Sequence, residues 1–240
     1  MTIKNGKNLT QSIVDNLGLS IVKGEYDGLN FPTEAALVVK YSASRNIIRE
    51  AVKILSEKGL LLSRPKRGTS IRLEKDWNIL DTDILNWFLE RKMSLPLLRE
   101  FFQVRMQIEP AAAALAASVS GPDEIEKISK AMECMAAAEV GDSNALDADI
   151  AFHIALLEAS GNRFYMKLSS LTETALRFSI RITNKHKNVD VHLKSHRDIL
   201  DAIKMGDAEK AHEKTKALLL TVGNIIDVRE KEEVNRLSGC

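Results

Sequence analysis

Three polar residues in the second half of the chain have the types and spacing of a metal or ligand site. Asp149 and His153 lie four residues apart in an apolar segment, so both side chains leave the same side of a helix. His196 lies in a later segment. A carboxylate and two imidazoles can bind zinc or another divalent metal. They can also form a buried ion pair or a hydrogen-bonded core histidine, and the spacing alone favours that structural interpretation.

Arg105 is a fourth polar residue that interrupts an apolar helical pattern. Its neighbours Phe102 and Met106 are apolar. Arginine is suited to bidentate recognition of a carboxylate, so Arg105 is a candidate to bind an acidic ligand. The alternative is an ion pair within its own helix, with Glu109 or Glu100.

The charge of the chain is unevenly distributed. Residues 1–75 contain 13 lysines and arginines against seven aspartates and glutamates, a net charge of +6, whereas residues 76–240 have a net charge of −5. The whole chain of 240 residues has a net charge of +1, with 45% apolar and 28% charged residues, as in an ordinary soluble protein. The basic first third indicates a nucleic-acid-binding module, unless the charges cluster there by chance.

The pattern of the first third predicts a winged helix-turn-helix. Apolar residues at steps of four predict a helix over residues 9–21. Thr33 and Ser44 are placed to cap two further helices, which we expect to end near residues 40 and 59. A turn from Pro65 to Gly68 then separates two short predicted strands.

The start of the third predicted helix carries the residues suited to reading DNA. A helix-turn-helix presents this end to the base edges of the major groove, where arginine matches guanine and asparagine matches adenine. The basic hairpin can lie along the phosphate backbone or enter the minor groove. The alternative is a solvated helix face. The predicted DNA-contacting residues are Thr33, Ser44, Arg45, Asn46, Arg49, Lys66, Arg67 and Gly68.

The remaining two thirds predict an all-helical antiparallel bundle. Alanine is abundant, aromatic residues make up 5%, and the loops between predicted helices are short. One helix is expected to run from Arg163 to Asn184. We expect a DNA-binding domain over residues 1–75, a linker over 76–82 and a helical effector-binding and dimerisation domain over 83–240.

Cysteine usage and hydropathy predict a cytoplasmic protein. The two cysteines cannot form a disulfide framework and fit a reducing compartment. No apolar run approaches the roughly 18 residues that span a bilayer, and the first residues contain no apolar stretch of signal-peptide length. We therefore expect no membrane partner.

The first third resembles the DNA-binding domain of GntR-type bacterial transcription regulators. The resemblance covers residues 9–73, with its most specific motifs at residues 31–34, 44–51 and 67–69. It implies that Arg45 and Arg49 read bases, that the polar residues at the two helix starts contact phosphates or base edges, and that the Gly68 turn enters the minor groove. Many relatives have an arginine directly after the Pro-x-Glu segment, where this chain has Ala35, so its operator is expected to differ from the commonest one.

The bundle resembles the effector domain of the FadR subgroup of that family, the FCD domain. The resemblance covers residues 83 to about 229, and its motifs surround Arg105, Asp149, His153 and His196. In such domains an aspartate and three histidines hold a divalent metal, which an acidic ligand joins. The resemblance therefore implies a zinc, nickel or manganese site at Asp149, His153 and His196. This chain has Leu218 where the last histidine is expected, so we predict a weak metal site, or direct hydrogen bonds from these residues to a polyol.

The missing histidine and residues 80–87 further resemble the subgroup of D-galactonate-responsive regulators, which repress operons for sugar-acid catabolism. We therefore expect a homodimeric, ligand-responsive repressor rather than an enzyme. It should bind an inverted-repeat operator in double-stranded DNA and be released by a sugar acid, a hexonate such as galactonate. The predicted effector-binding residues are Arg105, Asp149, His153 and His196.

Two alternatives remain. The first is a regulator that responds to a di- or tricarboxylate bound through a metal. The second is a metal-dependent hydrolase that uses the same three metal ligands. The second alternative would leave the basic hairpin unexplained, and the sequence contains no general-base motif and no nucleophile elbow.

Overall fold

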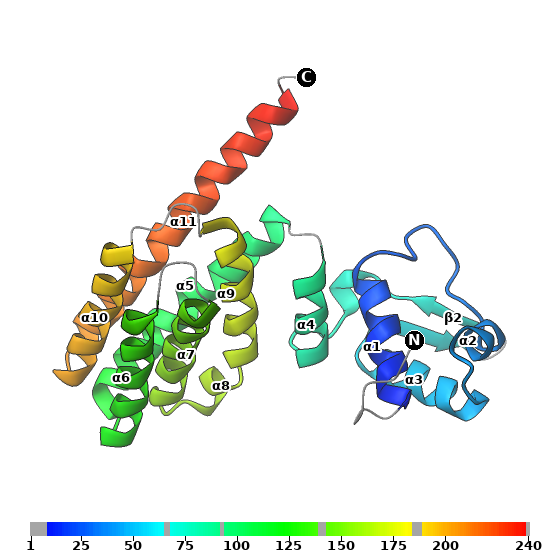
Figure 1. The fold of residues 1–240 in the computed structure, drawn as a ribbon, viewed down its shortest axis with the longest axis horizontal. Helices are drawn as coiled ribbons and strands as arrows, with labels where there is room; N and C mark the ends of the chain where they lie inside the picture. Colours follow the sequence, from blue (N-terminus) through cyan, green and yellow to red (C-terminus); the bar gives the residue numbers. More distant parts are fainter. Residues whose placement is uncertain (1–8, 65–67, 92–93, 139–142, 184–188, 239–240) are drawn as a thin grey trace. The chain divides into compact units, whose positions relative to one another are not determined.

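The computed structural model describes residues 9–64, 68–91, 94–138, 143–183 and 189–238. The chain divides into two compact units, Met1–Lys92 and Met93–Cys240 (Figure 1). None of the described helices is long and apolar enough to cross a membrane.

The first unit consists of a group of helices and a two-stranded hairpin. The three helices that precede the hairpin are α1 (Leu9–Val22), α2 (Glu34–Tyr41) and α3 (Arg45–Glu57). Strands β1 (Leu61–Arg64) and β2 (Gly68–Ile71) pair antiparallel, with Arg64 opposite Gly68. This order confirms the predicted winged helix-turn-helix.

Two capping side chains set where α2 and α3 begin. The hydroxyl of Thr33 accepts a hydrogen bond from the N–H of Ala36 at 3.2 Å, and that of Ser44 accepts one from the N–H of Ile47 at 3.4 Å. Between the two helices Ser42 adopts the left-handed backbone conformation, with φ of 50°, and turns the chain sharply. Both predicted caps are confirmed, and the Ser44 cap places Arg45 and Asn46 in the first turn of α3.

The hairpin is followed by a short 3-10 turn, η1 (Glu74–Asp76), and by helix α4 (Thr82–Glu90). Asp81 caps α4 by accepting from the N–H of Asp83 at 3.0 Å. The same carboxylate accepts from Nζ of Lys58, at the end of α3, at 2.8 Å. This ion pair ties the start of α4 to the helix-turn-helix.

Helix α4 packs on α1. Trp87 of α4 lies directly against Gly18 of α1, where any side chain at position 18 would overlap the indole ring. The first compact unit therefore extends to Lys92. Helix α4 belongs with the winged helix, whereas the sequence placed residues 83 onward in the helical domain. The apolar pattern identifies α4 as a helix but does not show which surface it covers.

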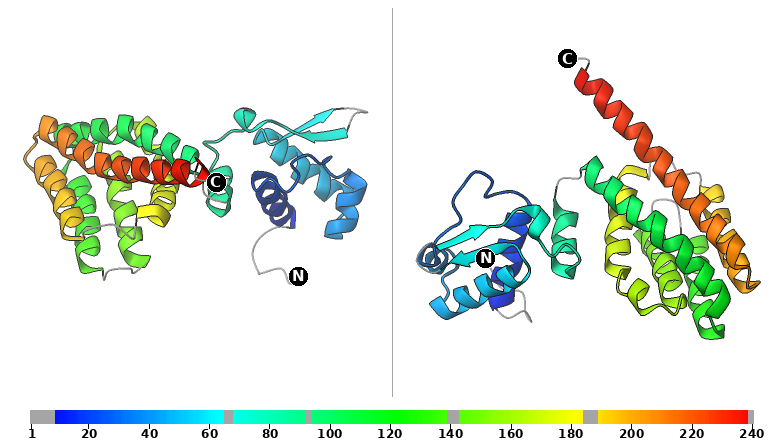
Figure 2. Two further views of the ribbon diagram at one scale, coloured as in Figure 1. Left: turned by 90° about the horizontal axis from the view of Figure 1, so that it is seen from above. Right: turned by 180° about the vertical axis from the view of Figure 1, so that it is seen from behind.

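The second unit is a bundle of helices, as predicted. They are α5 (Leu95–Val119), α6 (Pro122–Ala137), α7 (Ser143–Ala159), α8 (Arg163–Met166), α9 (Ser169–Thr183), α10 (Val189–Lys204) and α11 (Ala208–Ser238). Helices α5 and α11 run side by side in both views of Figure 2. Arg99 of α5 joins them by donating to Glu230 of α11 at 2.8 Å.

The segment expected to form one helix from residue 163 to 184 forms two, α8 and α9. The N–H groups of Lys167 and Leu168 bond to carbonyls three residues earlier, so the helix tightens and ends there. The break contains neither glycine nor proline, which is why the sequence pattern predicted a continuous helix.

The core of the second unit is built from α5, α6, α7, α10 and α11. Phe152 on α7 is fully buried, and its ring lies 4.9 Å from the ring of His196 on α10 and 5.8 Å from that of His153, centroid to centroid. The apolar core therefore directly supports the polar residues of the predicted effector site.

Candidate functional site

The predicted DNA-contacting residues at the start of α3 lie on its exposed side. Ser44, Arg45 and Asn46 are exposed, while the apolar face of the helix is buried. The side chain of Arg49, one turn later, is 64% exposed, and its Nε lies 3.0 Å from Oε2 of Glu34 on α2. This contact orients Arg49 and leaves its other N–H groups available to DNA.

A groove runs between the hairpin and the starts of α2 and α3. The residues that line it include Thr33, Glu34, Arg49, Arg64 and Gly68. Gly68 has a φ of +80° with open space where a side chain would project, so the backbone conformation favours glycine there. The predicted contacts Lys66 and Arg67 lie outside the described residues. The groove thus brings together predicted DNA contacts from α2, α3 and the hairpin.

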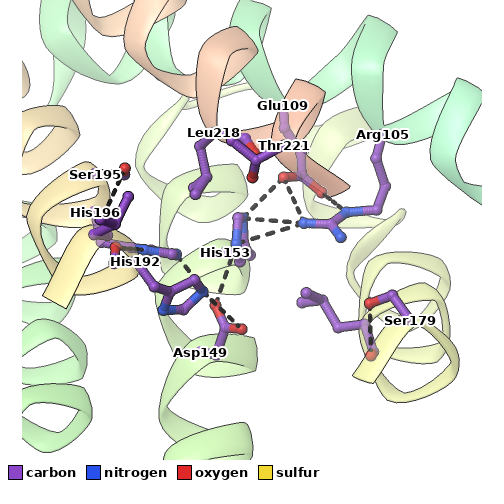
Figure 3. Close-up of polar contacts among 12 residues, drawn as sticks. Arg105, Glu109, Asp149, His153, Ser179, His192, Ser195, His196, Leu218 and Thr221 are labelled. Atoms are coloured by element: carbon purple, nitrogen blue, oxygen red, sulfur yellow. Dashed lines mark hydrogen bonds and ion pairs between the residues drawn. The ribbon is translucent and has the colours of Figure 1, made fainter. Parts of the chain in front are cut away.

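The four residues predicted to bind the effector meet in one buried cluster in the second unit (Figure 3). Arg105 comes from α5, Asp149 and His153 come from α7, and His196 comes from α10. Three helices that are separate in the sequence therefore converge on this point.

The carboxylate of Asp149 lies between the two histidines. Its Oδ1 is 3.1 Å from Nε2 of His196 and 3.5 Å from Nε2 of His153. One ligand atom from each residue lies within 4.8 Å of the other two. Among the described residues, Nε2 of His196 has no hydrogen-bond partner, despite its short distance from Asp149. One potential ligand atom from each of Asp149, His153 and His196 therefore lies in this cluster. No hydrogen bond among the described residues explains why Nε2 of His196 lies so close to Asp149.

The other ring nitrogen of each histidine faces an acceptor. Nδ1 of His153 lies 2.8 Å from Oε2 of Glu109, and Nδ1 of His196 lies 2.8 Å from the main-chain oxygen of His192. A histidine that donates through Nδ1 keeps its lone pair on Nε2. Both Nε2 atoms face Asp149, so the residues present fit a divalent metal.

Glu109 pairs with Arg105 one helical turn away. Nε of Arg105 donates to Oε1 of Glu109 at 2.5 Å, and Nη2 donates to Oε2 at 3.1 Å. This is the ion pair within α5 that the sequence offered as an alternative to ligand binding. Nη2 also lies 3.4 Å from Nε2 of His153. Arg105 therefore contacts the cluster through His153 while its positive charge is paired with Glu109.

The electrostatics keep Glu109 ionised. Burial by itself would raise the pKa of Glu109, but the charges of Arg105 and His153 outweigh it and hold the pKa at about 2. Burial by itself would lower the pKa of His153, whereas the adjacent Glu109 carboxylate raises it above the usual value. Glu109 is thus a permanent negative charge that stabilises positive charge in the cluster.

His192 also belongs to the cluster, although the sequence analysis did not select it. It precedes His196 by four residues on α10, and the two rings are 4.3 Å apart. Its Nε2 lies 3.6 Å from Oδ2 of Asp149 (Figure 3). The four-residue spacing of the two histidines was the signal that could have identified it. Leu218 of α11, at the position expected for the family's last histidine, is buried in the apolar core.

Comparison with known proteins finds one family model that matches within each unit. The family model described as bacterial regulatory proteins, gntR family, matches residues 9–71, and the FCD domain model matches residues 100–221. The galactonate operon transcriptional repressor of Escherichia coli (strain K12) is 33% identical over 209 residues, which cover 86% of this chain and 91% of the repressor. The HTH-type transcriptional regulator YieP of the same strain, described as uncharacterized, is 32% identical over 216 residues, covering 89% and 93%.

A solved structure is similar to this chain over most of its length. The Streptococcus agalactiae GntR structure is 26% identical and superposes with a TM-score of 0.50, covering 89% of this chain and 98% of that one. Proteins of these families are transcription regulators rather than enzymes, which argues against the metal-dependent hydrolase. The chain belongs to the GntR family of bacterial transcription regulators and contains an FCD domain.

Proposed function

We propose that the protein is a homodimeric repressor that binds an inverted-repeat operator in double-stranded DNA. A sugar acid, a hexonate such as galactonate, binds to the second unit and releases the operator. The exposed start of α3 supports the DNA-binding part. The likeness to a galactonate operon repressor, together with the buried cluster, supports the acidic effector.

The single observation that carries the effector assignment is the approach of Arg105 to the cluster, 3.4 Å from His153. Glu109 engages Nε and Nη2 of Arg105, and no described residue forms a hydrogen bond with Nη1. Nη1 is therefore the group we assign to the effector's carboxylate. Asp149 accepts hydrogen bonds from hydroxyls, and imidazoles can donate or accept them.

Release of the operator requires a difference in affinity between two states. The effector can shift the equilibrium only if it binds the arrangement that is incompetent for DNA more tightly than the competent one. The proposed effector therefore weakens operator binding, and operator binding weakens effector binding by the same factor.

Calorimetric titration of galactonate and of galactose tests the assignment, in parallel with an operator-release assay. Galactonate should bind far more tightly, because galactose has no carboxylate for Arg105. The matched variant is Arg105→Met combined with Glu109→Gln, which removes both charges and leaves neither buried alone. It should lose galactonate binding and still bind the operator. Equal binding of the two sugars, or normal release of the variant, would contradict the carboxylate role.

A second candidate effector is a di- or tricarboxylate that binds through a divalent metal. The observation that favours it is the convergence of Asp149, His153 and His196, with both histidine Nε2 atoms facing the carboxylate. A thermal-shift screen of aldonates, uronates and dicarboxylates, with and without a chelator, separates the candidates. A metal-bound carboxylate should lose its stabilising effect when the chelator is added, whereas a directly bound hexonate should keep it.

A further inference from the structure

We propose that helices α6 and α7 form the surface through which two copies of this chain associate. The helix pair of one copy packs face to face on the same pair of a second copy, and the four helices form a bundle. The inference rests on the proposed homodimer and names the surface that joins its two chains.

An apolar groove runs between α6 and α7, which lie side by side (Figure 1). It has a volume of about 740 Å³, and alanines form much of its lining: Ala131 from α6, and Ala148, Ala151 and Ala155 from α7. The distance between packed helices depends on the side chains at the contact, so side chains this small let another helix approach closely. The shape of the groove is therefore suited to receive a helix.

The two edges of the groove carry opposite charges. The charged residues that line it are Lys127 and Lys130 on α6, and Asp147 and Glu158 on α7. Their side chains are between 40% and 69% exposed. A surface with one basic and one acidic edge is complementary to itself, because a two-fold axis brings each edge to the opposite edge of a second copy. This charge pattern identifies the occupant of the groove as another copy of the chain.

The antiparallel course of α6 and α7 determines how the two copies match. Nζ of Lys127, near the start of α6, lies 3.8 Å from Oε2 of Glu158, near the end of α7, so these residues are at the same level along the helix pair. A two-fold axis parallel to the helices places α6 of each copy over α7 of the other without changing that level. Lys127 of one copy then meets Glu158 of the second copy, and the symmetry repeats the contact.

The groove and the buried polar cluster use opposite faces of α7. Asp149 and His153 point into the bundle and are buried, whereas Ala151, between them in the sequence, is exposed and lines the groove. Cys134 of α6 also lines the groove and is exposed. A second copy would cover Ala151 and Cys134 without contacting the effector residues, so the two sites can be changed independently.

Sedimentation of the full-length protein at several concentrations tests the proposal without effector or DNA. Ala151→Glu should raise the dimer dissociation constant at least about tenfold, because it places an unpaired charge in the centre of the contact. Glutamate is a good helix former and position 151 is exposed, so the variant should keep its helical circular dichroism. Ala217→Glu is the matched control; Ala217 is exposed on α11 and does not line the groove, so its dissociation constant should stay within about twofold of wild type.

Exchange of charges separates contacts between copies from contacts within one chain. Lys127→Glu alone and Glu158→Lys alone should each weaken self-association by about tenfold, because the symmetry makes one substitution change two contacts. An equimolar mixture of the two variants should form mixed dimers about as tight as the wild type, since each chain supplies the charge that the other has lost. An ion pair confined to one chain is not restored by mixing.

Cys134 gives an independent readout, in a Cys240→Ser background. Its alkylation should slow as the wild-type concentration rises and should not slow in Ala151→Glu. A wild type that stays monomeric, an Ala151→Glu variant that dimerises normally, or a mixture that associates no better than its components would overturn the proposal. Operator binding is measured separately on the same variants: an Ala151→Glu variant that remains dimeric and binds the operator removes this surface and leaves the proposed function standing.

Discussion

Nδ1 of His153 on α7 lies 2.8 Å from Oε2 of Glu109 on α5, and both side chains are buried. Glu109 also receives two hydrogen bonds from Arg105. One carboxylate therefore fixes the orientation of an imidazole and neutralises a guanidinium. Glu109 therefore holds two residues of the cluster in place without being one of the proposed effector-binding or metal-binding residues.

Glu109→Gln should lower the free energy of unfolding by about 3–5 kcal/mol, because it leaves the charge of Arg105 buried without its partner. Urea unfolding followed by circular dichroism measures the loss. Glu100→Gln is the control on the same helix; Glu100 is exposed, and its change should stay within about 0.5 kcal/mol. If both variants unfold at the same urea concentration as wild type, the buried Arg105–Glu109 ion pair does not contribute to the free energy of unfolding as predicted.

Arg45→Ala should weaken operator binding by roughly 1–3 kcal/mol and relax the preference at one base pair, as expected for loss of a bidentate contact to a base. The operator can be obtained by selection from random duplexes, and mobility-shift titration measures both effects. Lys53→Ala is the control: Lys53 is also exposed on α3, two turns later, and is paired with Glu57 at 3.9 Å. Unchanged specificity of the Arg45 variant would show that another face reads the DNA.

Lys66→Ala should weaken binding to every DNA sequence to a similar extent, because we expect Lys66 to contact phosphates rather than bases. The slope of log affinity against log salt concentration should become shallower by about one unit. Titrations of operator and random duplex at several salt concentrations provide the measurement. A loss confined to the operator would instead assign Lys66 to base recognition.

Gly18→Ala should destabilise the first unit by about 1–3 kcal/mol, because the added methyl group overlaps the indole of Trp87. Tryptophan fluorescence during thermal unfolding reports the change close to the altered contact. Lys23→Ala, just after α1 and exposed, should have little effect. A Gly18 variant as stable as wild type would mean that α4 readily moves away from α1.

The elements that were predicted well are those with local signals. Ser44 has the residue type of an N-cap and precedes an apolar stripe, and the structure shows its hydroxyl capping α3. The break between α8 and α9 has no such signal. Main-chain hydrogen bonds to carbonyls three residues earlier end α8 at this point, and neither glycine nor proline marks it. The contact of Gly18 with Trp87 joins segments that are far apart in the sequence, so helical periodicity could not reveal it.

The candidate site was predicted in part for the same reason. Asp149 and His153 share one helix turn, and their spacing predicted a shared face. The sequence predicts Glu109 only as a possible partner of Arg105, because nothing in it shows that α5 and α7 meet. The four-residue spacing of His192 and His196 places them on one face of a helix, but nothing in the sequence shows that this face meets Asp149 on α7.

The packing of α4 on α1 determines where the winged-helix domain can be cut for transfer to another protein. A fragment cut at residue 75 would expose the surface of α1 that Trp87 covers, and it would separate Lys58 from Asp81. A chimera that joins this winged helix to the sensor of another regulator should therefore be spliced after Lys92. Splicing there keeps Trp87 with Gly18, and Lys58 with Asp81, in the same transferred fragment.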